Sequence, residues 1–273
     1  MQTIDYALGR TPEEFDRVRA QARLWETDTA RLLDRLGLAP GARCLDAGCG
    51  PGETMRLMAE RTGPTGTVTG LDIDPVTCAV TESALHEQGY RTCRARVHDL
   101  TGALPIPDGP YDLVYARLLL FHLPQRVEVL RRLWASVAPG GHLLLQDYDV
   151  GAVAAQPPLA LLDEMIGVVL EAFGAAGCDV HAGTRLPHLM IEAGAGAPDG
   201  TDVAGRLLPI TAAAPILESV YRSLLPVAYA HGLTSLDRAE ASLAALHRET
   251  AADPGRYVRL PLLGGAWKKR PAQ

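Results

Sequence analysis

Three glycines at alternate positions most constrain what this chain can fold into. Gly48, Gly50 and Gly52 follow a short apolar stretch that ends at Asp46, and a helical pattern begins directly after them. Glycine lets the backbone turn sharply and brings bare main chain close to a ligand. A helix that begins behind such a turn offers unpaired N–H groups to a negatively charged group. The stretch therefore predicts a strand, a tight turn and a helix start, with a purely structural glycine-rich turn as the alternative.

A second predicted strand, residues 67–72, ends at Asp72. Its distance from the turn, about 20 residues, is the spacing of the ribose-binding acid in a nucleoside-binding βαβ unit. A carboxylate can accept hydrogen bonds from two ribose hydroxyls at once. A dinucleotide-binding fingerprint has the spacing G-x-G-x-x-G, whereas the glycines here have the spacing G-x-G-x-G. The spacing thus favours a nucleoside ligand over a dinucleotide.

The run L-D-A-G-C-G-P-G over residues 45–52 resembles the first motif of the class I S-adenosylmethionine (SAM)-dependent methyltransferases. The resemblance is close over residues 40–150 and extends to the remainder only through the order of the elements. It implies an α/β fold, in which a Rossmann-like, seven-stranded, mostly parallel sheet with one reversed strand carries helices on both faces. We expect residues 1–38 to form an N-terminal lid helix segment and residues 39–150 the SAM-binding core. Residues 151–273 would form a helical insertion after the fifth strand that lines the substrate pocket, and the last two strands of the same domain.

Alternating strand and helix patterns predict where these elements lie. A capping box at residues 11–14 begins the lid helix, and Gly37 ends it. The core pattern indicates strands at 43–46, 67–72, 92–98, 112–116 and 142–147, helices at 52–61, 75–88 and 124–137, a proline-rich loop at 104–110 and a turn at 139–141. After residue 149 the alternation breaks, and the patterns indicate helices at 159–173, 186–192, 216–230 and 236–250 and strands at 202–210 and 256–263.

The resemblance implies that five residues surround the methionine end of the cofactor. Asp46 would hold the amine directly or through water, or it would bond the backbone of its own turn. Gly48 and Gly50 would line the methionine. Arg117 follows the strand 112–116 and would lie under the methionine. Many family members have a small or polar residue at this position. A bacterial subgroup of the family, however, shares the A-R-L-x-L-x-H-L run that begins at residue 116. Gln21, on the lid helix, would reach the methionine carboxylate.

Five further residues are expected around the adenosine, because ligands of such sheets bind outside the carboxyl ends of the strands. Asp72 would bind the ribose hydroxyls, and Ile73 would pack on one face of the adenine. His98, Asp99 and Leu100 end the third strand. Asp99 would accept a hydrogen bond from the adenine amino group, unless it is a surface loop acid, and Leu100 would offer its N–H to a ring nitrogen.

Three candidate catalytic residues lie at the same predicted edge of the sheet. His122 precedes a helix and is placed to act as a general base, or only to orient other groups. Asp147 and Tyr148 end the fifth strand. Because an unpaired buried polar group is costly, we expect these two side chains to be solvated, paired or in contact with the substrate.

Composition narrows the class of partner and the location. The formal net charge is −6, and the lysines are confined to Lys268 and Lys269. The sequence has no stripe of basic residues, which argues against a nucleic-acid partner. No apolar run approaches the roughly 20 residues of a membrane helix. Five cysteines lie without a disulfide framework or metal-ligand spacing. We therefore expect a cytoplasmic monomer or homodimer with no metal, no nucleic-acid partner and no membrane partner.

The sequence thus predicts an enzyme that uses SAM and releases S-adenosylhomocysteine. The long segment after residue 150 predicts a small organic acceptor, methylated on nitrogen, oxygen or an aromatic carbon. The resemblance to the bacterial subgroup implies that this acceptor is a specialised metabolite. One alternative is a protein of the same fold that binds SAM without methyl transfer, as a regulator or in another reaction. A second alternative, a nicotinamide-dependent oxidoreductase, is disfavoured by the glycine spacing.

Overall fold

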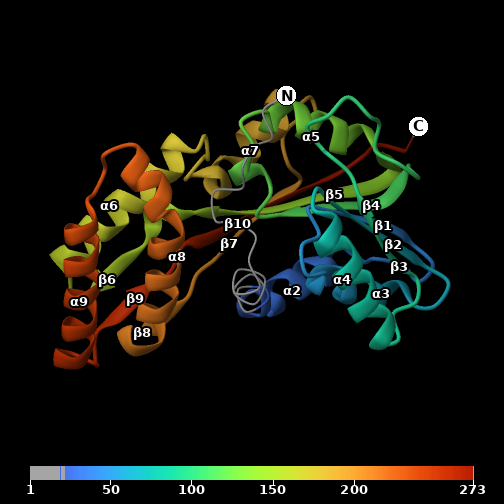
Figure 1. Ribbon diagram of the computed structural model, residues 1–273. Helices are drawn as coiled ribbons and strands as arrows, with labels where there is room; N and C mark the ends of the chain where they lie inside the picture. Colours follow the sequence, from blue (N-terminus) through green and yellow to red (C-terminus); the bar gives the residue numbers. More distant parts are fainter. Residues whose placement is uncertain (1–18, 20–21, 273) are drawn as a thin grey trace.

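A twisted seven-stranded sheet forms the centre of the molecule (Figure 1). The computed structural model describes residue 19 and residues 22–272. The strands have the order β3-β2-β1-β4-β5-β10-β7, and β10 runs antiparallel to both of its neighbours. This confirms the expected mostly parallel sheet with one reversed strand. The bounds are β1 Arg43–Ala47, β2 Thr67–Asp72, β3 Cys93–Val97, β4 Tyr111–Arg117, β5 Val137–Asp149, β7 Gly200–Ala204 and β10 Leu262–Lys269.

Helices cover both faces of this sheet, because successive strand residues point to opposite sides. Cys44 belongs to a core cluster with residues of α2 (Glu26–Leu36), α3 (Glu53–Thr62) and α4 (Pro75–Glu87). The next residue, Leu45, belongs to a separate cluster with residues of α5 (Arg126–Ala135) and α7 (Ala182–Glu192). Figure 1 shows α5 and α7 above the sheet and α2, α3 and α4 below it.

Local helix signals agree with the helix ends of the core. Gly37 ends α2 in the left-handed conformation, with φ of 65°. The side chain of Asp74 accepts a hydrogen bond from the N–H of Thr77, 2.8 Å away, at the start of α4, and Pro75 is the first helical residue. These ends depend on residues a few positions apart, which is why the sequence predicts them well.

Segments of the chain after β5 that do not join the central sheet form a second part with its own apolar core. Its helices are α6 (Ala160–Ala175), α8 (Ile210–Ala230) and α9 (Leu236–Ala252), which Figure 1 shows on the left, beyond the carboxyl end of β5. A three-stranded antiparallel sheet joins them, with the order β6-β9-β8 and the bounds Ala154–Gln156, Tyr257–Arg259 and Leu207–Pro209. Short 3-10 helices at Leu120–His122 and Val150–Ala152 follow β4 and β5.

Two predicted strands and one predicted turn are wrong, for identifiable reasons. The predicted strand 202–210 is two strands, because β7 pairs with β10 and β8 pairs with β9 in the other sheet. The predicted strand 256–263 is likewise divided, and Pro261, which has no N–H to donate, lies between β9 and β10. The predicted turn 139–141 lies inside β5, where Gly140 has φ of 82° and the register with β4 shifts.

Helix α7 packs on the sheet through glycines at direct backbone contact. A Cβ added at Gly264 of β10 would overlap the carbonyl group of Gly183 in α7. A Cβ added at Gly183 would overlap the carbonyl group of Asp147 in β5. Because both obstacles are backbone atoms, neither can move aside as a flexible side chain would. This contact holds α7 against the two strands that continue toward the second part of the molecule.

We predict that Gly264→Ala lowers the free energy of unfolding by about 1–3 kcal/mol, because the added methyl group forces α7 away from the sheet. Urea denaturation of the full chain measures this change. Gly167→Ala in α6 is the matched control, since a Cβ there meets no atom within 4 Å. The control should leave the stability unchanged or raise it by up to about 1 kcal/mol. Equal stability of Gly264→Ala and the wild type would show that the contact does not constrain α7.

Candidate active site

The glycine turn after β1 has the backbone conformation that its sequence predicts. Gly48, Gly50 and Gly52 have φ angles of 72°, 46° and 77°, a region that favours glycine. The N–H groups of Gly48 and Cys49 both donate to the carbonyl oxygen of Leu71, at 2.8 and 3.0 Å. The turn after β1 is therefore fastened to the end of β2, and α3 begins directly behind it at Glu53.

Asp72 joins the end of β2 to the glycine turn. Its Oδ2 accepts from the N–H of Gly50 at 3.1 Å, and its Oδ1 accepts from the N–H of Asp74 at 3.0 Å. Burial raises the pKa of Asp72, and these N–H groups oppose the shift. Each carboxylate oxygen has a second lone pair, so Asp72 can still accept from a ligand diol. The next residue, Ile73, leaves 43% of its surface exposed beside it, as a residue that packs on a planar ring would.

Asp46 is a buried acid next to the guanidinium of Arg117. Burial raises the pKa of Asp46 to about 7; the positive charge of Arg117 opposes the shift, and the negative charge of Asp72 adds to it. Arg117 Nη1 donates to Thr29 Oγ1 at 3.1 Å, so the guanidinium is bonded to α2. An acid that is held in this environment suits a cationic ligand group such as an ammonium.

A buried polar network lies behind Arg117. Gln146 Oε1 accepts from Thr29 Oγ1 at 2.8 Å and from the hydroxyl of Tyr115 at 2.7 Å. All three side chains are buried, so each hydrogen bond offsets a desolvation penalty. The sequence analysis missed these residues, although Gln146 interrupts the apolar run 143–145, which is a detectable signal. The network connects α2, β4 and β5. It lies directly beneath the edge of the sheet where the carboxyl ends of β1, β2, β3 and β4 meet, which we call the ligand edge.

The end of β3 presents one unsatisfied polar atom. His98 Nε2 is buried without a hydrogen-bond partner among the residues that the structure describes. Burial lowers the pKa of His98, and the nearby charge of Arg132 lowers it further. Asp99 Oδ1 accepts from the hydroxyl and the N–H of Thr101, and the hydroxyl bond lowers its pKa. Leu100 is buried, and its carbonyl accepts from Arg132.

Asp147 fastens the loop that follows β4. Its Oδ2 accepts from the N–H of Phe121 and its Oδ1 from the N–H of Tyr148, both at 3.0 Å. Burial raises its pKa to about 7 against the effect of these donors. The same loop contains Leu118 with φ of 54°, a costly conformation for a leucine, which is held by the bond from its N–H to the carbonyl of Gln146. Asp147 therefore fixes the loop with Oδ2, whereas its Oδ1 binds the main chain of β5 itself.

His122 ends the short helix that this loop forms. Its ring packs edge-on against Phe121, with centroids 4.8 Å apart, and its Nδ1 lies 3.9 Å from the sulfur of Cys178. Tyr148 lies on the other side of β5, where its hydroxyl accepts from Trp25 Nε1 at 2.6 Å. Strand alternation explains why neighbouring Asp147 and Tyr148 serve different elements. Gln21, the remaining predicted residue, lies outside the described residues.

The ligand edge as a whole suits SAM, the cofactor that the resemblance implies. Asp46 is a buried acid beside the position of the methionine, and Asp72 has spare lone pairs for the ribose diol. The unsatisfied nitrogen of His98 lies beside the position of the adenine. In the described part of the chain, no three His, Cys, Asp or Glu side chains gather as metal ligands. No helix within residue 19 and residues 22–272 combines the length and apolar character that a membrane crossing requires.

Comparisons with known proteins point to methyltransferases. Residues 44–141 match the family described as "Methyltransferase domain". Methyltransferase GfsG of Streptomyces halstedii is 26% identical over 245 residues, which cover 86% of this chain and 80% of that protein. Nocamycin O-methyltransferase of Saccharothrix syringae is 35% identical over 138 residues, which cover 50% of this chain and 46% of that protein. The chain thus matches about half the length of this second relative.

Solved structures show the same architecture. Phosphoethanolamine N-methyltransferase 2 of Haemonchus contortus, solved with S-adenosylhomocysteine, superposes with a TM-score of 0.59 and 17% identity. The superposition covers 99% of this chain and 61% of that chain. At this level of identity the likeness shows the fold alone.

We predict that Asp46→Asn changes how stability depends on pH. Because the pKa of Asp46 is raised in the folded state, Asp46 loses its proton at a lower pH in the unfolded chain than in the folded one. Deprotonation therefore favours the unfolded state, and the wild type loses stability between about pH 4 and about pH 7. Asparagine has no proton to lose. Asp46→Asn should therefore gain on the order of 1–3 kcal/mol relative to the wild type between about pH 5 and about pH 8, as urea denaturation measures.

Asp147→Asn is the matched control, because the pKa of Asp147 is raised to about 7 as well. Its carboxylate accepts from two N–H groups, and asparagine has one acceptor oxygen for them. At about pH 4 the control should therefore be less stable than the wild type by about 1–3 kcal/mol, and this deficit should shrink as the pH rises toward about 8, because the wild type loses stability over that range. An identical pH dependence in Asp46→Asn and the wild type would contradict the assignment to Asp46.

Proposed function

The chain belongs to the class I SAM-dependent methyltransferases, and we propose that it methylates a small organic acceptor held between the sheet edge and the helices that follow β5. The observation that carries the proposal is the joining of the glycine turn, Asp72 and Asp46 at one edge of the sheet. The relative named nocamycin O-methyltransferase acts, by its name, on a small molecule, which supports an acceptor of this class. The five free cysteines support a reducing, cytoplasmic location.

When bound, SAM supplies a methyl group already activated by its sulfonium. We assign the methionine ammonium to the carboxylate of Asp46, since a buried acid gains from a cationic partner. Gly48 and Gly50 let the turn approach the methionine without side chains. Arg117, which Thr29 of the lid helix holds, neutralises Asp46 before the cofactor arrives and lies beside the methionine carboxylate. Gln21 is assigned to the same carboxylate.

At the adenosine end, Asp72 accepts from the ribose hydroxyls with its spare lone pairs. Ile73 covers one face of the adenine with its exposed side chain. Asp99 accepts from the adenine amino group with Oδ2, since Thr101 occupies Oδ1. The N–H of Leu100 and the ring of His98 complete the adenine edge. Each contact uses a group at the carboxyl end of a strand.

Residues after β4 and β5 serve the acceptor. The chemistry needs an acceptor atom in line behind the methyl group, so positioning supplies most of the rate. His122 accepts the proton when the acceptor is a hydroxyl or another acidic group. Asp147 is a positioning residue, because it fixes the loop that carries His122. Tyr148 and Trp25 form one wall of the acceptor site, and Arg206 packs on the Trp25 ring with its guanidinium carbon 4.7 Å from the centroid.

The proposal is tested by incubating the full chain with SAM and a panel of small phenols, alcohols, amines and carboxylic acids. Mass spectrometry should detect an acceptor that gains one methyl group together with S-adenosylhomocysteine. Asp72→Ala is the control, and it should weaken SAM binding at least about tenfold because a charge-assisted contact to the ribose is lost. Intact SAM together with a chemically changed panel member would instead favour the alternative, in which the cofactor is bound without methyl transfer.

We predict that His122→Ala lowers kcat by about 10²-fold or more on an acidic acceptor and leaves KM nearly unchanged. The rising limb of the pH–rate profile should disappear with it. His188→Ala is the control, because His188 is an exposed histidine of α7 that pairs with Glu192. A loss of less than about threefold in kcat would remove His122 from the role of general base.

A further inference from the structure

One crossover of the parallel sheet has no helix. The crossovers β1 to β2, β2 to β3 and β4 to β5 contain α3, α4 and α5, whereas residues 98–110 between β3 and β4 form a loop. Parallel sheets are normally covered on both faces. Here no helix follows β3 to cover this part of the sheet, and Arg94 and Arg96 of β3 stay about half exposed. The exposed side chains of this face are therefore polar.

The strand register places these polar side chains together. Arg43 is opposite Thr67, and Thr69 is opposite Arg94, so all four lie on one face. Arg96 lies two residues after Arg94 on the same face, about 7 Å further along the strand. Thr67 and Arg94 belong to the first half of their strands, whereas Arg96 is opposite Leu71, the residue before Asp72. Along β2, Thr67 and Asp72 are separated by about 16 Å.

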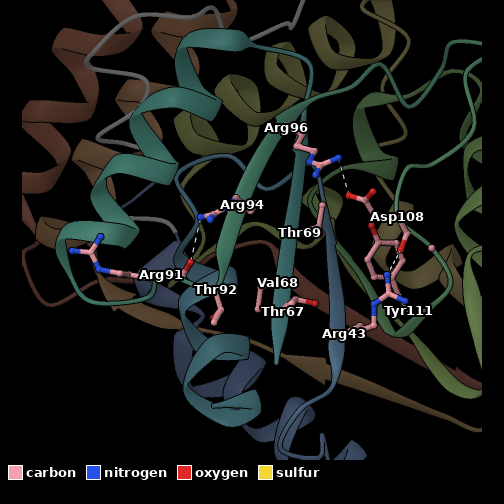
Figure 2. A pocket seen from close by; sticks show the side chains of 11 residues that line it. Arg43, Thr67, Val68, Thr69, Arg91, Thr92, Arg94, Arg96, Asp108 and Tyr111 are labelled. Carbon is pink, nitrogen blue, oxygen red and sulfur yellow. Dashed lines mark hydrogen bonds and ion pairs between the residues drawn. The ribbon is translucent and has the colours of Figure 1, made fainter. Parts of the chain in front are cut away.

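A groove of about 550 Å³ runs over this face. Figure 2 shows Arg91 and Arg94 on one side of it and Arg96 reaching toward Asp108 on the other, with the threonines of β2 between them. Four arginines line the groove against one carboxylate, that of Asp108, in a chain whose formal net charge is −6. The lining therefore opposes the overall charge of the chain.

The guanidinium groups keep donors for a ligand. Arg96 pairs with Asp108 at 2.8 Å, and the Asp108 carbonyl accepts from Arg43. Arg94 Nη1 donates to the carbonyls of Arg91 and Cys93, and lies 4.0 Å from Glu82. Each guanidinium has five N–H donors, so several remain free on each. The side chains of Arg94 and Arg96 are about half exposed, at 53% and 51%.

We propose that this groove binds a small molecule that carries two or more linked phosphate groups. Its lining offers arginine and threonine donors and few acceptors, which matches a ligand whose oxygens only accept. Arginine forks bind phosphate oxygens in pairs, and Arg94 and Arg96 approach the groove from its two sides (Figure 2). The groove volume is in the range of small-molecule sites. None of the residues that line the groove is among those assigned to SAM or to the acceptor.

Calorimetric titration of the full chain with inorganic diphosphate tests this site. We expect saturable binding that weakens with added salt. The double variant Arg94→Gln/Arg96→Gln should bind diphosphate at least about tenfold more weakly, with SAM binding unchanged. Arg131→Gln is the matched control, because Arg131 is an exposed arginine of α5 that pairs with Glu128. The affinity of this variant for diphosphate should stay within about twofold of the wild type.

If the double variant fails to fold, Arg91→Gln, at an exposed position beside the groove, should weaken binding at least about threefold.

Parallel titrations separate the sources of the anion. Tighter binding of ADP than of diphosphate would support an organic phosphate ester, and equal binding would support recognition of the phosphates alone. A lack of saturation by diphosphate and ADP up to about 10 mM would overturn the proposal. So would unchanged affinity in the arginine variants. Tenfold tighter binding of an eight-nucleotide DNA or of a hexaglutamate peptide would also overturn it, in favour of a macromolecular partner.

Discussion

The carboxylate of Asp72 joins the turn after β1 to the end of β2, and the ligand edge depends on this junction. It accepts from the N–H of Gly50, while the carbonyl of the preceding Leu71 accepts from the N–H groups of Gly48 and Cys49. The packing behind the junction is tight, since a Cβ at Gly70 would overlap the side chain of Cys49. The turn is therefore held in its ligand-binding shape by the protein itself, which lowers the cost of ordering it when the cofactor binds.

Strand β5 connects this edge to the remainder of the molecule through three consecutive polar residues. Gln146 bonds α2 and β4, Asp147 bonds the loop after β4, and Tyr148 bonds Trp25. Because successive side chains point to opposite faces, one strand can hold both α2 and the loop after β4. A small change in β5 would therefore move α2 and this loop together. These residues position others, which is why polar groups persist in a strand that is otherwise buried.

Much of the core fold could be predicted because its signals are local. Asp74 begins α4, Gly37 ends α2 and the glycines of the turn have positive φ, as their neighbours along the chain require. Predictions were wrong where pairing partners lie far apart in the sequence. Nothing near residue 205 reveals that β7 pairs with β10 and β8 with β9. The small second sheet was missed for the same reason, since three-residue strands have no periodicity of their own.

The sequence by itself determined the fold class, the glycine turn and the order of the acids along the ligand edge, because these follow from the conformational freedom of glycine and from the alternation of strands and helices. Only the tertiary structure decided what the polar residues contact. It assigned both oxygens of Asp147 to backbone donors, placed Gln146 in a buried network and left Arg94 and Arg96 of β3 about half exposed. The physical reason is that hydrogen bonding and burial depend on atoms brought together from distant parts of the chain, and no local pattern encodes those distances.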